Sequence, residues 1–441
     1  MNAGNHQFPR VLVISHNVFS PSTAMGRTLK EFFVGWDNQC IAQLYFHSEV
    51  PTDIVCENYF RITDVDVVKS IFSRKPFSKK FPKTEIQLSR VNPRTDTSIL
   101  SAIYQYSRKR TSLIYLLRNL IWKLGVWQSR DLEAWIENFD PQIIFFASGD
   151  YSFSYDITYK IAKNRNIPVI TYCCDDYYLQ KIPAYAILRK YYHALFMKSV
   201  NNLMLYTSRI ITICDNMTFE YSTLFKTQIE TIYTIKSDFN NINASDDEEY
   251  MHKFVYLGNL GLNRHKPLIE LAHSINANQL AGNDSYIHVY SSEKRKRILK
   301  AFSKEPGIIF HGEVSKSEVD KIIQKSEYVL HVESFRKKEI EKIRYSISTK
   351  IPDLLASNSN ILVYGPRYIA SVDYLETHNA AVILSKDNLL ADLQHYMSES
   401  EDIKQKRRIN AKELVESNHD SIKNREVLLT IINASISERN I

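Results

Sequence analysis

Short apolar segments alternate with helix-forming segments along the 441-residue chain, and no other feature limits its fold as strongly. Strand patterns lie at 10–15, 142–146, 168–172 and 209–213, with helical patterns between them. Parallel neighbours in a sheet need a crossover connection, usually a helix, so this alternation predicts parallel sheets. The first series therefore predicts a Rossmann-like domain over residues 1–245.

A second series of the same kind begins with a strand at 254–257, after a polar, acidic stretch at 242–250 that we interpret as an interdomain linker. It predicts a second Rossmann-like domain over 251–420. The charged, helical tail is expected to end in a helix over 421–441 that can pack back on the first domain. The predicted fold class is α/β, with two Rossmann-like domains facing across a ligand-binding cleft.

Composition argues against several classes of protein. The chain has only 11 glycines and contains neither G-x-G-x-x-G nor a P-loop motif. The sequence therefore gives no evidence for a dinucleotide-binding site or a P-loop nucleotide-binding site. Its five cysteines lack paired metal-ligand spacing and are expected to be reduced thiols of a cytosolic protein. No secretory signal and no uncharged apolar run of about 18 residues is present, so no membrane-spanning helix is expected.

Positive charge is concentrated in one segment, residues 69–130. It contains fourteen basic and two acidic residues, a net charge of +12, whereas the whole chain carries +7 and the remainder therefore −5. Its amphipathic core at 111–127 contains Arg118 and Lys123, which exclude a spanning helix but suit a helix lying among anionic headgroups. Nucleic acid is an alternative partner, but no nucleic-acid-binding signature accompanies the segment. A buried helix with a solvated basic face is the other alternative.

The stretch 345–366 has the profile of a nucleotide-sugar site. Hydroxyl residues, beginning at Ser346, can cap a predicted helix that carries Lys350 and Asp353 in its first turn. Asn358 can end this helix in a left-handed conformation. A helix N-terminus with one cation and one carboxylate, inside an α/β unit, suits a phosphate and a sugar hydroxyl. Arg264 lies between an earlier strand and helix, and Lys266 is a weaker candidate beside it. Fixed cations at these positions can neutralise a diphosphate without a metal ion.

These residues resemble the GT-B-type glycosyltransferases, particularly the retaining family-four-like group that assembles bacterial surface polysaccharides. The segment 256–260 is similar to the strand and turn that open the donor domain, and Arg264 falls where the family keeps a cation on the diphosphate. The segment 310–314 is similar to the strand whose following loop holds the base, which makes the backbone of Val314 a candidate contact. Asp353 matches the carboxylate that takes the ribose hydroxyls.

The resemblance departs from the family in its paired-glutamate motif, E-x7-E. Tyr345 occupies the place of the first Glu, eight residues before Asp353. Glu333 and Glu341 have the required spacing but lie ahead of the apolar helix, so we interpret that match as coincidental. The missing Glu keeps an alternative open: a non-catalytic GT-B-type accessory or chaperone subunit of a glycan-assembly machine.

The first domain also contains candidate site residues. Gly26 lies between the first strand and helix, where a backbone amide can approach the donor β-phosphate, although a simple tight turn explains it equally well. Asp150, Asp175 and Asp176 follow predicted strands, and one of them could orient or deprotonate an acceptor hydroxyl. Helix capping is the competing interpretation. His16, after the first strand, is a further candidate.

The resemblance implies an enzyme that moves a sugar from a nucleotide-diphosphate-sugar donor to a lipid-linked or glycan acceptor in cell-surface polysaccharide or capsule synthesis. It implies retaining transfer with no cofactor and no metal. We expect a cytoplasmic protein, peripheral on the inner face of the cell membrane, whose segment 69–130 contacts the anionic membrane surface. No nucleic-acid partner is expected.

Overall fold

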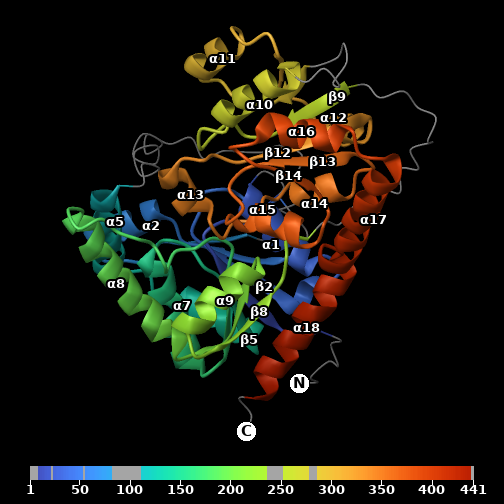
Figure 1. Ribbon diagram of the computed structural model, residues 1–441. Coiled ribbons are helices and arrows are strands. Elements are labelled where there is room, and N and C mark those ends of the chain that lie inside the picture. Colours follow the sequence, from blue (N-terminus) through green and yellow to red (C-terminus); the bar gives the residue numbers. More distant parts are fainter. Residues whose placement is uncertain are drawn as a thin grey trace. The chain divides into compact units, whose positions relative to one another are not determined.

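The computed structural model describes residues 8–20, 23–52, 55–81, 111–235, 252–277 and 286–438. The chain divides into two compact units (Figure 1). The first unit comprises Met1–Ile232 and Ser421–Ile441, and the second comprises Tyr233–Asp420. The predicted linker at 242–250 lies outside the described residues, as do residues 82–110 of the basic segment.

An eight-stranded sheet forms the centre of the first unit, in the order β4-β3-β2-β1-β5-β6-β7-β8. Neighbouring strands are parallel except β3 and β4, which are antiparallel. Its strands are β1 (Val11–Ser15), β2 (Ile41–Tyr45), β3 (Asn58–Arg61), β4 (Lys79–Phe81), β5 (Ile143–Ala147), β6 (Val169–Cys173), β7 (Thr207–Thr212) and β8 (Gln228–Thr231). Every residue of β1 and β5 is buried, as expected for parallel strands covered on both faces.

Helices of the first unit include one from the C-terminal end of the chain. Its described helices are α1 (Ala24–Phe33), α2 (Asp64–Ser73), α5 (Ser112–Leu124), α6 (Arg130–Phe139), α7 (Ser152–Arg165), α8 (Ile187–Met204), α9 (Asp215–Leu224) and α18 (Ser421–Ser437). Helix α18 lies against α1. The Arg425 guanidinium donates a hydrogen bond of 2.8 Å to the Val34 carbonyl, and Arg209 forms an ion pair with Glu438. These contacts fix the C-terminal helix to the first unit.

Six parallel strands form the sheet of the second unit, in the order β11-β10-β9-β12-β13-β14. Its strands are β9 (His252–Leu257), β10 (Ile287–Tyr290), β11 (Ile308–Gly312), β12 (Ser326–Val332), β13 (Asn360–Tyr364) and β14 (Val382–Leu384). Its described helices are α10 (His265–Ala277), α11 (Lys296–Phe302), α12 (Lys316–Gln324), α13 (Lys337–Ile343), α14 (Ile351–Leu355), α15 (Ala370–Thr377), α16 (Leu389–Met397) and α17 (Glu401–Asn418). In this doubly wound sheet the strand order reverses between the parallel neighbours β9 and β12, and such sheets bind their ligands at this reversal point.

The helix predicted in the 345–366 stretch is shorter than expected. Helix α14 has five residues, and its N-cap is Lys350, which makes no side-chain capping bond. The hydroxyl cap expected from Ser346 and its neighbours is therefore wrong. The helix also ends at Ala356 in a right-handed conformation, not at a left-handed Asn358. One turn and a half of helix carries only a weak dipole, so an anion here must be held mainly by side chains.

His419 lies where the chain leaves the second unit, and it interrupts the helical tail between α17 and α18. Its side chain is fully buried. The imidazole Nδ1 lies 2.7 Å from the Thr234 carbonyl oxygen, and Nε2 lies 2.9 Å from the Tyr374 hydroxyl. Because Thr234 lies where the chain enters this unit, His419 joins the incoming and outgoing segments. Among the described helices, none is both long and apolar enough to span a membrane.

Candidate functional site

A buried ion pair lies at the reversal point of the second sheet. Arg264 follows β9 through a short loop, and Glu333 is the first residue after β12. The guanidinium Nε and Nη2 donate two hydrogen bonds, each 2.9 Å, to the two oxygens of the Glu333 carboxylate. The side chain of Glu333 is only 4% exposed and that of Arg264 18%. Burial alone would lower the pKa of Arg264, but the adjacent Glu333 carboxylate outweighs it and raises the pKa.

The loop before Arg264 holds an unusual backbone. Leu262 and Asn263 both adopt left-handed conformations, with φ of 56° and 61°. Such conformations cost on the order of 1 kcal/mol or more for a residue with a side chain, especially leucine, and they gather at functional sites. The Tyr256 hydroxyl supports the loop by donating a 2.9 Å hydrogen bond to the Asn259 carbonyl. The loop that places Arg264 at the end of the sheet therefore has a strained backbone.

Lys350, the N-cap residue of α14, extends its side chain to the same end of the sheet as Arg264. Its Nζ donates a 2.8 Å hydrogen bond to the carbonyl of Leu257, the last residue of β9. A Cβ on Gly258 would lie 2.9 Å from this Nζ, so glycine leaves the room that the ammonium needs. Burial, and then the nearby charge of Arg264, lower the pKa of Lys350 to about 8, while Asp353 acts in the opposite direction. The ammonium is thus still largely charged at neutral pH.

His331 completes the polar group around Glu333. Its Nε2 lies 3.1 Å from the Ser371 hydroxyl and 3.8 Å from a Glu333 oxygen. Burial lowers the pKa of His331, although the Glu333 carboxylate acts to raise it. The formal charges of Arg264, Glu333 and Lys350 sum to +1, and the Asp353 carboxylate near Lys350 brings the total to zero. An anion would therefore be bound locally, by the Lys350 ammonium and by the N–H groups of Arg264, which its carboxylate partner already orients.

The structure places the other predicted donor-site residues as follows. Arg264 and Asp353 both lie close enough to Lys350 to shift its pKa, Arg264 downward and Asp353 upward. Lys266 is exposed in the first turn of α10, and Val314 lies in the loop after β11. Tyr345 is buried with the Arg344 guanidinium 4.7 Å above its ring, and Ser346 is partly buried beside it.

Glu333 is the residue of the candidate site that sequence reasoning missed. Its E-x7-E spacing with Glu341 was interpreted as coincidental, yet the carboxylate lies at the centre of the site. A glutamate directly after a buried strand was the available signal, because ligand groups in such sheets follow the strand ends. The structure adds that the charge of Arg264 is compensated by Glu333, while the role expected of Arg264 stays a prediction.

In the first unit, the strand order reverses between β1 and β5, and two predicted site residues, His16 and Asp150, follow these strands. The rings of His16 and Tyr151 have centroids 5.1 Å apart. The Asp150 carboxylate accepts a hydrogen bond from the Tyr115 hydroxyl, and the Tyr115 and Tyr151 rings are in contact. His16 and Asp150 are thus brought to one polar and aromatic cluster.

The remaining predicted residues of this unit have local structural partners. Asp176 accepts hydrogen bonds from the backbone amides of Tyr178 and Leu179 at 3.1 and 3.0 Å, which is an Asx turn in the loop after β6. It is not the helix cap considered as the alternative, because the next described helix begins at Ile187. Asp175 is exposed, with its carboxylate 3.3 Å from the Tyr177 hydroxyl.

Gly26 lies inside helix α1, which begins at Ala24, and not in the loop between the first strand and helix, where it was expected. Its amide donates a 3.1 Å hydrogen bond to the N-cap Thr23 side chain. A Cβ at Gly26 would also lie 2.6 Å from the Val18 carbonyl oxygen. The expectation that this amide approaches a phosphate is therefore corrected: it is engaged in the cap, and close packing explains the glycine.

Comparison with solved structures shows the same fold over nearly the whole chain. An E. coli trehalose-6-phosphate protein bound with UDP-2-fluoro glucose aligns over 96% of this chain and 98% of its own, with a TM-score of 0.58 and 9% identity. Anabaena HepE in complex with UDP covers 96% and 100%, with a TM-score of 0.59 and 8% identity. WaaG, a glycosyltransferase involved in lipopolysaccharide biosynthesis, covers 96% and 99%, with a TM-score of 0.51 and 10% identity.

The fold is that of the GT-B glycosyltransferases. The fold class expected from the sequence is thereby confirmed, with two α/β units built on parallel sheets. The sequence itself matches no protein-family model and no curated protein. At identities near 10% the structural likeness establishes the fold, and function has to be argued from the site.

Proposed function

We propose that this protein is a glycosyltransferase that takes its sugar from a nucleotide-diphosphate-sugar donor. The observation that carries the proposal is the Arg264–Glu333–Lys350 group at the reversal point of the second sheet. Two cations and one buried carboxylate, placed at strand ends, can bind a diphosphate and a hydroxylated sugar together. Structural neighbours of the same fold were solved with UDP or a UDP-sugar, which supports this donor class.

In this proposal each side chain has a separate task. The Lys350 ammonium and the N–H groups of Arg264 bind the diphosphate and stabilise its charge as it leaves. Glu333 holds the guanidinium in place and offers carboxylate oxygens to the donor sugar. Asp353 binds the ribose, and the backbone near Val314 contacts the base. Retaining transfer without a cofactor or a metal in the reaction is part of the proposal, because the cations already present can serve the leaving group.

The acceptor side of the proposal rests on the first unit. Asp150 or His16 would orient or deprotonate the acceptor hydroxyl at the β1–β5 reversal point, where their cluster lies. We propose a lipid-linked or glycan acceptor of cell-surface polysaccharide synthesis. This choice is supported by an exposed apolar surface on the same unit.

That surface is formed by α5 and by the start of α8, which are in contact (Figure 1). Its α5 half is a stripe of exposed leucines with helical spacing, namely Leu113, Leu117, Leu120 and Leu124. Its α8 half consists of the exposed residues Tyr185, Ile187, Leu188 and Tyr191. Exposed Lys123, Arg189 and Lys190 accompany these apolar side chains. An apolar stripe accompanied by cations suits the surface of an anionic bilayer.

One residue of the basic segment does not belong to that surface. Arg118 is buried, and its Nε donates a 2.9 Å hydrogen bond to Asp64. Its guanidinium lies 3.8 Å from the centre of the Tyr151 ring. The proposed membrane contact is therefore made by the exposed α5–α8 surface and not by Arg118. Through this surface the protein would attach peripherally to the inner face of the cell membrane.

Donor binding is tested by a thermal-shift screen against UDP-, GDP-, ADP- and dTDP-sugars. A ligand present at about 100 times its Kd stabilises a protein by about 2.7 kcal/mol, a shift that such a screen detects easily. One donor class should raise the melting temperature, and nucleoside diphosphate should be released when an acceptor is added. If no donor shifts the melting temperature, the enzyme proposal fails. Donor binding without release of nucleoside diphosphate would favour the second candidate, a non-catalytic accessory subunit. The absence of a Glu at position 345 is the observation that keeps this candidate open.

Donor affinity should fall as the pH rises through about 8. Burial, the largest cause, lowers the pKa of Lys350 to about 8, so the ammonium that binds the diphosphate loses its proton above this value. We expect affinity to drop by up to about tenfold per pH unit beyond that point. Titration of the donor between pH 6.5 and 9.5 measures the effect. A Lys350→Met variant should bind weakly and without this pH dependence; an equally steep profile in the variant would assign the titration to another group.

Membrane attachment should depend on the leucines of α5. A Leu117→Glu/Leu120→Glu variant places two carboxylates in the proposed contact and should bind vesicles containing anionic lipid at least about tenfold more weakly. Co-sedimentation with anionic and with zwitterionic vesicles measures this. The matched control is Ile403→Glu, an exposed apolar position on α17 in the other unit. Equal binding of the α5 variant and the control would remove α5 from the contact.

A further inference from the structure

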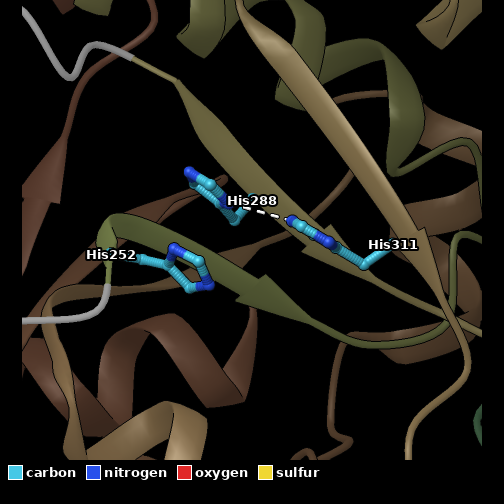
Figure 2. A group of neighbouring side chains, drawn as sticks. All are labelled: His252, His288 and His311. Carbon is cyan, nitrogen blue, oxygen red and sulfur yellow. Dashed lines mark hydrogen bonds between the residues drawn. The ribbon is translucent and has the colours of Figure 1, made fainter.

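Three histidines lie side by side on neighbouring strands of the second sheet, in a part of it that the proposed function does not use (Figure 2). His252 is the first residue of β9, His288 lies on β10 and His311 lies near the end of β11. Strand β10 is paired with both β9 and β11, so its histidine stands between the other two strands. Sequence analysis predicted no metal ligands, and the structure brings these three together from distant parts of the chain.

Their ring nitrogens are close enough to share one ion. The Nδ1 of His288 lies 2.9 Å from the Nε2 of His311. The rings of His252 and His288 are stacked with centroids 3.8 Å apart. One ligand nitrogen from each residue lies within 4.8 Å of the other two. Two nitrogens bound to one tetrahedral zinc ion, at about 2.0–2.1 Å each, are about 3.3–3.4 Å apart. To form the site, the His288 and His311 nitrogens would have to move apart by about 0.4 to 0.5 Å. The His252 nitrogen would have to lie at the same distance from both, which side-chain rotation can achieve from a starting separation of at most 4.8 Å.

The electrostatic setting favours neutral imidazoles, the form that binds metals. In the 2.9 Å contact between His288 and His311, one ring nitrogen must accept, so at least one of the two rings is neutral. Burial lowers the pKa of His311. Two cationic rings at this distance would repel each other strongly, whereas a metal ion replaces the shared proton with a stronger attraction for both.

Tyr290 provides support of the kind that metal-binding histidines usually have. Its hydroxyl lies 2.8 Å from the Nε2 of His252, and its ring stacks on that of His311 with centroids 4.4 Å apart. A partner on one ring nitrogen fixes the orientation of the imidazole and leaves the other nitrogen for the ion. Tyr290 thus positions two of the three rings.

Access and donor chemistry narrow the class of ligand. His288 is buried, His252 is partly exposed and His311 is exposed, so an ion can enter from solvent and keep a water molecule as its fourth ligand. A ligand set of imidazoles only suits Zn²⁺, Ni²⁺ or Cu²⁺. The hard cations Mg²⁺ and Ca²⁺ prefer oxygen ligands, which this set does not offer.

We propose that His252, His288 and His311 form a three-histidine site for a divalent transition-metal ion of the Zn²⁺ class. His252 lies five residues before Leu257, which at about 3.3 Å per residue places it about 16 Å along β9 from the carbonyl that binds Lys350. The ion would take no part in sugar transfer. It would cross-link three strands, including β11 at the edge of the sheet, and so stabilise the second unit.

The test uses the full chain, stripped of metal by a chelator, and Zn²⁺ alone as the probe. Calorimetric titration should show one strong site, and Zn²⁺ should raise the melting temperature. His311→Ala, whose side chain is exposed, should weaken Zn²⁺ binding at least about tenfold and remove the rise, without changing the melting temperature of the metal-free protein. His252→Ala should behave alike. The matched control is His395→Ala, an exposed histidine on α16, which should bind as the native protein does.

Spectroscopy with Co²⁺ in place of Zn²⁺ separates a built site from adventitious binding. The native protein should give the intense visible absorption of tetrahedral Co²⁺, and His311→Ala should lose it. The proposal is overturned if His311→Ala and His252→Ala bind Zn²⁺ as tightly as the native protein. It is equally overturned if the metal-free native protein takes up no Zn²⁺, in which case the three rings form only a hydrogen-bonded stack.

Discussion

Replacing Arg264 with alanine should both destabilise the second unit and abolish donor binding. The substitution leaves the Glu333 carboxylate buried without its bidentate partner, and breaking a buried pair in this way costs about 3–5 kcal/mol. It also removes a cation from the proposed diphosphate site, which should lower turnover by roughly 10²–10³-fold. Urea unfolding measures the first effect, and donor titration with turnover assays measures the second.

A double variant separates these two consequences. Arg264→Met/Glu333→Leu replaces the buried pair with apolar side chains of similar length, and such replacements are often neutral for stability. We expect it to recover most of the lost stability while donor binding stays absent. Recovery of both properties would show that the pair serves the fold alone. Arg165→Ala provides the control, because its ion pair with Glu137 leaves the carboxylate largely exposed and should contribute little to either measurement.

Replacing His419 with alanine should destabilise the protein by about 3 kcal/mol. The change opens a cavity at a fully buried position and leaves the Thr234 carbonyl and the Tyr374 hydroxyl without this partner. For a unit of this size the melting temperature should fall by roughly 6–12 °C. His395→Ala, at an exposed position, is the control and should leave the melting temperature unchanged. A similar small effect of both variants would show that the incoming and outgoing segments are held together by other contacts.

The same histidine predicts a loss of stability in acid. Burial lowers the pKa of His419 to about 4, with the Thr234 carbonyl acting in the opposite direction. In the unfolded chain a histidine titrates near 6.5. The unfolded state therefore binds the proton first as the pH falls, so this contribution is complete above about pH 6.5 and is lost progressively down to about pH 4. It amounts to about 3 kcal/mol in the free energy of unfolding, and His419→Ala should lack it.

Long apolar runs could be predicted as strands from the sequence, whereas β2, a short run interrupted by a polar residue, could not. The pattern at 142–146 overlaps β5, and that at 10–15 overlaps β1. Strand β2 was missed because Gln43 interrupts its apolar run. In the structure Gln43 is fully buried, and its amide donates to the Ser15 hydroxyl and accepts from the Phe19 amide. These partners are 24 and 28 residues away, so the sequence pattern did not reveal that the polar side chain would be satisfied.

The candidate site was predicted only in part, for a related reason. Arg264 and Lys350 could be selected because each lies at a junction between predicted elements. Glu333 could not, because its partner Arg264 lies 69 residues away and the two meet only through the pairing of β9 with β12. Strand order likewise brings His288 and His311 together across 23 residues. Local patterns identify which residues end a strand, but sheet order decides which strand ends are neighbours.

The second unit has the topology of a domain inserted into the first, because the first unit contains the residues on both sides of it. The hydrogen bond between His419 and Thr234 holds the two ends of the inserted segment together. Residues 233–420 begin and end at adjacent points, so the segment can be excised as one body without cutting through its sheet. The flanking residues of the first unit could be rejoined by a short linker, and the excised segment could be circularised or permuted, since neighbouring termini are what such rearrangements need. The chain thus offers a natural pair of cut points at which the two halves of the protein can be produced and exchanged independently.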